Sequence, residues 1–312
     1  MATLDSVRDR VRAAVAEGDY QPALHLTESI RRHFPRDLET GRLRGQIQLA
    51  SGRWEEAQGS FAAVLEVDPE SVVARAGLAL LAEEEGDPDR ALEQLERVFD
   101  LDGSNSEVAA EICRLRSRSS HSWPVDLGSA QHALARRSLV EKKYERAAVL
   151  FQDAVWRAPE RLEVAVGLAR ALWLTGRQEE AERVAAEVLA IHPSCLKMLA
   201  ILAGASFARG EAEAMFLLRK TDELDPGNRV ARRLFLDAGL PFPRVGVDPE
   251  VPEAELRGVA GSPSRNRPAL EESEAEDSAE EDWEEEEEPE PFFLPEAQLE
   301  GEWVRGKREA GD

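Results

Sequence analysis

The chain has 312 residues, of which 42% are hydrophobic, and its formal net charge is −23. This length allows one large or two ordinary domains with a sizeable apolar core. An acidic excess of this size excludes a broad surface for nucleic acid or for an anionic membrane, because both require clustered Lys and Arg.

The first twenty residues, MATLDSVRDRVRAAVAEGDY, are charged from the start and lack the apolar core of a signal peptide. No later stretch approaches the ~18 consecutive apolar residues of a membrane span. The two cysteines, Cys113 and Cys195, lie in apolar helical contexts without a CxxC motif, which favours thiols over a disulfide. We therefore expect a reduced, cytoplasmic protein, and the Ala/Arg/Glu-rich composition suggests a bacterial source.

A repeat of about 34 residues runs along the chain. The end of each repeat is marked by a turn residue, and these residues are Pro35, Pro69, Gly103, Pro159, Pro193 and Pro226. A Gly or Lys precedes each of these by 16 or 17 residues, and in most units an Ala follows that residue by five. We interpret each unit as two helices: the Gly permits the turn between them, the Ala allows their close approach, and the Pro ends the second helix.

The segments "GDYQPALHLTESIRRHFP", "GRWEEAQGSFAAVLEVDP", "KKYERAAVLFQDAVWRAP" and "GRQEEAERVAAEVLAIHP" carry this pattern most clearly. In these segments the chain resembles the tetratricopeptide repeat family, over roughly residues 1–240. The resemblance implies an all-α solenoid of stacked helix pairs with a right-handed superhelical twist. Six repeats and their flanking helices give thirteen to fourteen helices before Leu240.

Between the third and fourth repeats the spacing grows by 22 residues. We expect one capping helix at Ser106–Arg118 followed by a linker, and a corresponding single helix at Asn228–Gly239. This predicts four regions, which are a first block of three repeats at 1–120, a linker at 121–127, a second block at 128–240 and a tail at 241–312. The sequence leaves open whether the blocks form one superhelix or two hinged ones.

The tail is acidic and loses the repeat. It holds 23 acidic and 7 basic residues, and Glu271–Glu290 contains 14 acids and no base. Such a segment repels itself and has little apolar area to bury, so we expect disorder. Beyond the acidic run lies a cluster of apolar side chains. It is either an incidental feature of a solvated tail or a docking motif. The residues of such a motif would be Phe292, Phe293, Leu294 and Trp303.

No catalytic constellation is visible in the sequence. It lacks HExxH, CxxC, GxxxxGK[ST], GxGxxG and GxSxG, and its five His residues show no ligand spacing. We therefore expect neither catalysis nor a metal or cofactor.

Binding is the better expectation. In the family, the first helix of each pair lines the concave surface, which the resemblance implies for this chain as well. The implied partner-binding residues are Arg8, Arg12, Arg42, Gln46, His132, Arg136, Arg170, Trp173 and Phe207. Arg side chains would bind carboxylates and Trp173 would form an apolar floor, although Arg side chains that merely keep a helix face soluble fit the same pattern.

These features predict a non-catalytic scaffold that holds a protein or peptide partner, of acidic character, in its concave groove. A second hypothesis is a chaperone-like assembly factor or regulator whose acidic tail masks its own groove or a basic client. A more remote one is an enzyme subunit. Neither nucleic acid nor a membrane is an expected partner.

Overall fold

The computed structural model describes residues 1–103, 105–118, 127–243 and 249–259. Fourteen α-helices lie in these residues, in agreement with the predicted thirteen to fourteen, together with two short strands and one 3₁₀ helix. The elements are β1 (Ala2–Thr3), α1 (Leu4–Ala16), α2 (Tyr20–His33), α3 (Leu38–Ala50), α4 (Trp54–Val67), α5 (Val72–Glu84), α6 (Pro88–Leu101), α7 (Ser106–Arg118), α8 (Leu127–Val140), α9 (Tyr144–Arg157), α10 (Leu162–Leu174), α11 (Gln178–Ile191), α12 (Leu196–Ala208), α13 (Glu213–Leu224), α14 (Arg229–Asp237), β2 (Glu250–Val251) and η1 (Glu253–Val259).

The turn inside each helix pair has the backbone conformation that its Gly predicted. Gly52, for example, has φ +72°, and its N–H donates to the Leu49 carbonyl at 3.1 Å. The equivalent residue of the fourth pair is Lys142, which adopts φ +58° despite its Cβ atom. A left-handed conformation costs a non-Gly residue about 1–2 kcal/mol, so this pair carries a small local strain.

Small residues let the helices of each pair approach closely. The predicted alanines Ala23, Ala57, Ala91, Ala147 and Ala181 are all fully buried. Aromatic rings then cover glycines of neighbouring first helices. Phe61 of α4 lies against Gly45 and Gly77, and Phe151 of α9 lies against Gly167, so closely that an added Cβ would clash with either ring.

The helix predicted at Ser106–Arg118 is confirmed as α7, with the same bounds. Val108, Ile112 and Leu115 of α7 are buried against α5 and α6. Helix α8 also packs on α6, so the second set of repeats continues from the first. Residues 119–126 of the predicted linker lie outside the described residues, and the division into separate domains remains a prediction.

The two halves of the array contact each other through buried apolar side chains. One cluster of buried apolar residues contains Phe61 and Val67 from the first half and Phe151 and Trp173 from the second. The ends of the array also meet, since Arg229 at the start of α14 forms an ion pair with Asp5 of α1. Among the described residues, no helix is both long and apolar enough to cross a membrane.

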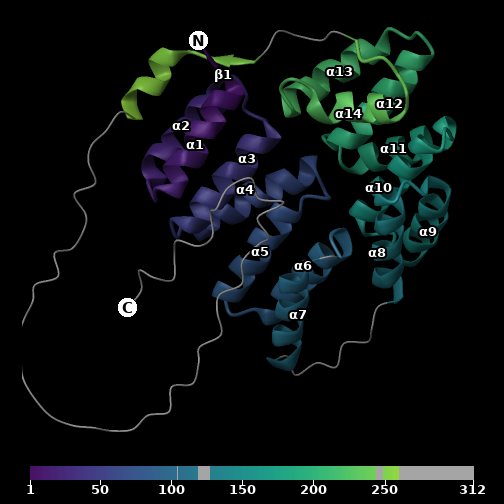
Figure 1. The fold of residues 1–312 in the computed structure, drawn as a ribbon, viewed down its shortest axis with the longest axis horizontal. Helices are drawn as coiled ribbons and strands as arrows, with labels where there is room; N and C mark the ends of the chain where they lie inside the picture. The colour runs from purple at the N-terminus through teal and green to yellow at the C-terminus, as the bar shows by residue number, and fades with distance from the viewer. Residues whose placement is uncertain (104, 119–126, 244–248, 260–312) are drawn as a thin grey trace, which may run out of the picture.

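Residues 249–259 correct the expectation of a tail without fixed structure from Pro241 onward. Strand β2 pairs antiparallel with β1, and η1 packs on α2 (Figure 1). The side chains of Val251 and Leu256 are buried. Their burial stabilises the folded segment, although the sequence had suggested too little apolar area for this. The acidic run Glu271–Glu290 and the aromatic segment beyond it lie outside the described residues.

Candidate functional site

Three of the residues predicted to bind a partner are buried. Arg8 is 2% exposed, His132 0% and Trp173 2%. Trp173, expected as a groove floor, is instead part of the core, where its ring covers Gly204 and its Nε1 donates to the Leu234 carbonyl at 3.2 Å. In this arrangement these three side chains have no surface free for a partner.

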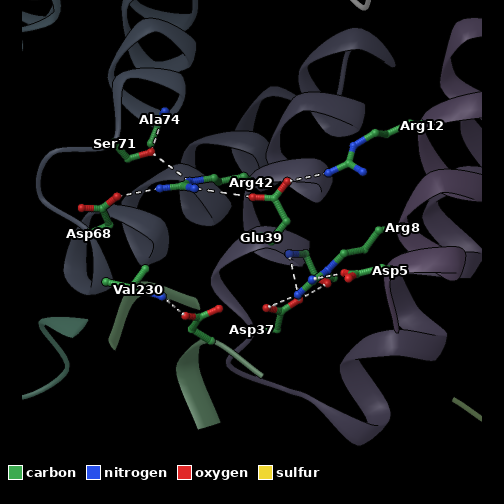
Figure 2. Close-up of polar contacts among 12 residues, drawn as sticks. Asp5, Arg8, Arg12, Asp37, Glu39, Arg42, Asp68, Ser71, Ala74 and Val230 are labelled. Atoms are coloured by element: carbon green, nitrogen blue, oxygen red, sulfur yellow. Dashed lines mark hydrogen bonds and ion pairs between the residues drawn. The ribbon is translucent and has the colours of Figure 1, made fainter. Parts of the chain in front are cut away.

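The burial of Arg8 is explained by its partners. Its Nη2 donates to both carboxylate oxygens of Asp37, at 2.7 and 2.8 Å, and its Nη1 donates to Asp5 at 3.0 Å (Figure 2). The Asp37 carboxylate also accepts from the backbone N–H of Thr40 at 3.0 Å, which caps the N-terminus of α3. Arg8 therefore ties the first repeat to the second.

Arg12 of α1 and Arg42 of α3 form further ion pairs close to that of Arg8 (Figure 2). Arg12 donates to Glu39 at 3.0 Å, and Arg42 donates to Asp68 at 2.6 Å. Both are partly exposed. The other predicted residues are Gln46, which is half-buried on α3, and Phe207, whose ring lies 5.7 Å from that of Phe235.

A cationic cluster forms where the turn between α4 and α5 meets the second half of the array. We use this name for Arg42, Arg136, Arg170 and Lys197, which surround the carboxylates of Asp68 and Glu70. Lys197 Nζ lies 2.7 Å from both Asp68 Oδ1 and Glu70 Oε2. Arg170 donates to Glu70 at 3.3 Å, and Arg136 makes a short contact with Glu70 Oε1.

The cluster joins three sequence-predicted residues to one that the sequence analysis missed. Lys197 is the second residue of α12. The predicted groove residues lie near the middle of each first helix, about one helical turn further along. Its partners lie more than 120 residues earlier in the chain. No local pattern could have found this contact, because it depends on how the two halves pack.

The cations stabilise the ionised forms of both carboxylates. Burial alone would raise the pKa of Glu70, but the charges of Arg136, Lys197 and Arg170 more than offset this and hold the pKa well below its usual range. For Asp68, burial is likewise outweighed by Lys197 and Arg42, so its pKa is also lowered. Both groups are thus carboxylates at neutral pH, and the cluster keeps an excess of positive charge.

We expect the stability of the protein to fall on acidification. Because the pKa values of Asp68 and Glu70 are lowered in the folded protein, both groups add to the free energy of unfolding. This contribution is complete above about pH 5, where both groups are ionised in the unfolded chain as well. It is lost as the pH falls toward the folded-state values, at up to about 1.4 kcal/mol per pH unit for each group. Urea unfolding between pH 7 and pH 3.5 measures this slope. The Glu70→Gln variant should show a shallower slope, and an unchanged slope would contradict the assignment.

A second buried network lies next to the cluster. Glu163 accepts from Arg75 at 3.1 Å and from Arg161 at 2.9 Å, and it lies 3.9 Å from Arg97. Arg161 in turn donates to Asp100 at 2.8 Å and contacts His132 Nδ1 at 3.3 Å. These contacts connect α5 and α6 with α8 and α10.

Reactive side chains in the described part of the chain show no catalytic arrangement. No group of three or more His, Cys, Asp or Glu residues there could hold a metal ion. Cys195 is buried, and burial raises the pKa of its thiol to about 12, which disfavours the nucleophilic thiolate.

Comparison with known families accounts for the helix pairs. A family model described as "Tetratricopeptide repeat" matches residues 48–115 and 139–205, one region in each half of the array. Both matched regions consist of tetratricopeptide repeats. Proteins of this family are generally non-catalytic scaffolds for protein–protein interactions. The search of curated proteins found no match.

Several solved tetratricopeptide repeat structures are similar to this chain. The P58(IPK) TPR domain shares 17% identity over 75% of the chain with a TM-score of 0.34, and the match spans 64% of that domain, which is less than two thirds. A tetratricopeptide repeat protein from Parabacteroides merdae shares 15% identity, with 75% of this chain and 98% of that one covered and a TM-score of 0.35. The TPR2AB domain of yeast Sti1, solved in a complex with pHSP90, shares 15% identity, with 75% and 99% covered and a TM-score of 0.32.

Proposed function

We propose that this tetratricopeptide repeat protein is an interaction scaffold that binds an acidic segment of a partner protein at the cationic cluster. The observation that carries the proposal is the charge imbalance of the cluster, in which four cations surround two buried carboxylates. Arg136, Arg170 and Lys197 are between 18% and 26% exposed, so the cluster faces solvent in part.

The two Arg side chains have donors to spare. Arg136 and Arg170 each use one Nη atom in the contact with Glu70. A guanidinium carries five N–H groups in a planar fork and binds a carboxylate best through two of them. A partner carboxylate can therefore bind at the exposed edge of the cluster without displacing Asp68 or Glu70.

A peptide titration tests this function. The probe is a fluorescent peptide with the sequence of residues 281–292, EDWEEEEEPEPF, added to the full-length protein at low and moderate salt. We expect saturable binding that weakens with salt. The double variant Arg136→Gln/Arg170→Gln should lower the affinity by about 10-fold or more, since it removes two charge-assisted contacts.

Arg137→Gln provides the matched control. Arg137 lies on the same helix as Arg136, but it is exposed and pairs with Glu141. This variant should bind the peptide within about 2-fold of the wild type, because rim charges away from the contact contribute little. If the control and the double variant lost the same amount of affinity for the peptide, the cationic cluster would be rejected as the binding site.

A second candidate function is regulation by the acidic run of the chain itself. Glu271–Glu290 has the charge that the cluster would bind, and it begins twelve residues after Val259, the last described residue. Such a tethered segment competes at a high effective concentration. Removal of residues 271–312 should then raise the affinity for the peptide. If the run instead holds a basic client, a Lys-rich peptide should bind the full-length protein and not the shortened one.

A further inference from the structure

A groove runs along α3 and α4, the two helices of the second repeat. Its volume is about 470 Å³, which lies within the range of about 300–1,000 Å³ that small-molecule sites occupy. The end of α2 and Ser194, in the turn before α12, also line it. Its cationic side chains in the described residues are Arg31, Arg36 and Arg44, which are not those of the cationic cluster. The groove is therefore a separate feature of the surface.

The floor of the groove is apolar and built from small residues. Val64 of α4 is buried, and an added Cβ at Gly41 of α3 would lie only 3.2 Å from its Cγ2 atom. Ala63 and Val67 continue this lining along α4. Such a floor suits the apolar body of a ligand, because the contact removes apolar surface from water.

Gly59 of α4 lines the groove and has no packing reason to be a glycine. In the first helices, Gly45 and Gly77 are covered by the ring of Phe61. At Gly59, by contrast, an added Cβ would meet no atom within 4 Å in the described part of the chain. Glycine is the poorest helix former apart from proline, so a glycine in the middle of α4 weakens the helix. This cost is explained if the groove has to stay open for a ligand.

Two arginines at the groove share one carboxylate. Arg31 Nη1 and Arg44 Nη1 donate to the same oxygen of Glu28, at 3.1 and 3.0 Å. The Gln48 amide, in the orientation that satisfies its neighbours, accepts from Arg44 Nε at 3.1 Å and donates to Ser60 Oγ at 2.6 Å. These contacts hold the Arg44 guanidinium in place and leave some of its five N–H groups unused. The two arginines thus carry one positive charge more than their shared partner neutralises.

The acidic side chains that line the groove are either paired or exposed. Asp37 forms its buried ion pair within the first two repeats. Glu56 and Glu66 are exposed on α4. Water and salt screen exposed charges more strongly than the charge of a partly buried side chain such as Arg44. The place at Arg31 and Arg44 therefore favours an anion.

We propose that this groove binds a small amphipathic organic acid, with its carboxylate at Arg31 and Arg44 and its apolar body over Val64 and beside Gly59. A guanidinium binds a carboxylate best through two parallel N–H donors, which fixes the acidic end of the ligand. The apolar end replaces water over the small residues of α4. This site goes beyond the scaffold function proposed above and does not depend on it.

Fluorescence titration of the full-length protein with anilinonaphthalene sulfonate tests the proposal. This probe carries an anionic group on an apolar body, and its emission rises in apolar surroundings. We expect saturable binding with a dissociation constant below about 100 µM, and displacement of the probe by decanoate, a straight-chain carboxylate. The absence of saturable binding would overturn the proposal. Displacement by the peptide of residues 281–292 and not by decanoate would also overturn it, because the groove would then take a protein segment.

Gly59→Leu fills the groove without breaking a contact. It should lower the affinity for the probe by about 10-fold or more. Its midpoint of urea unfolding should stay equal or rise, because Leu favours a helix more than Gly does. Arg44→Gln removes the charge and leaves the groove open, and it should weaken binding by about 5-fold or more.

Ala186→Leu is the matched control for the added side chain. Ala186 is exposed on α11, outside the groove. This variant should bind the probe within about 2-fold of the wild type, since its surface substitution leaves the groove unchanged. If Gly59→Leu bound the probe as tightly as this control, the groove would be rejected as the site.

Discussion

Replacement of Glu163 by Gln is expected to lower the free energy of unfolding by about 3–5 kcal/mol. Glu163 is only 1% exposed, and it is the shared acceptor of Arg75 and Arg161 between the two halves of the array. Burial would raise the pKa of Glu163, but Arg75, Arg161 and Arg97 outweigh it and lower the pKa, so the side chain is charged. Its neutralisation leaves the buried guanidinium of Arg75 without its carboxylate partner.

Urea unfolding at pH 7 followed by circular dichroism measures this loss. The matched control is Glu179→Gln, which changes an exposed carboxylate in the first turn of α11. That variant should stay within about 0.5 kcal/mol of the wild type, as surface substitutions usually do. A Glu163→Gln variant as stable as the control would show that the ion pairs between the halves contribute little to folding.

The Phe61→Ala substitution should lower the free energy of unfolding by a similar amount, about 3–5 kcal/mol. Phe61 is fully buried, and its ring fills the space over Gly45 and Gly77 of the two neighbouring first helices. Neither glycine has a side chain that could move into the cavity. The cost should therefore lie toward the upper end of what removal of a buried aromatic ring causes.

Trp156→Ala serves as the comparison for this loss. Trp156 lies on α9, another second helix of a pair, but its side chain is 80% exposed. Its truncation should change the free energy of unfolding by less than about 0.5 kcal/mol. If both variants lost the same amount of stability, the ring over the two glycines would not be the packing contact that holds adjacent repeats together.

The helices were predictable from sequence because their determinants are local. Gly52 and Pro69 sit at the turns on either side of α4, and Ala57 sits at the contact with α3, all within one repeat. Helix α7 was predictable for the same reason, since Val108, Ile112 and Leu115 recur at helical spacing. Each unit contacts mainly its neighbours in such an array, so a residue pattern of about 34 positions is sufficient to define it.

The candidate site was predictable only in part. The sequence indicated Arg42, Arg136 and Arg170 as inward-facing cations, and the structure brings these three together. It could not indicate that Trp173 would be covered by α14 or that Lys197 would join the cluster. These outcomes depend on pairs of residues separated by 61 and 129 positions.

The sequence by itself determined the repeat unit, the helix pairs, the additional helix α7 and the acidic character of the chain. The tertiary structure decided which charges neutralise each other and where the chain goes after α14. Helix formation and nearest-neighbour packing follow from spacings that a single repeat contains. The pairing of Glu70 with Arg136, and of Val251 with the first repeat, depends instead on the accumulated rotation of all the repeats between them, which no local pattern specifies.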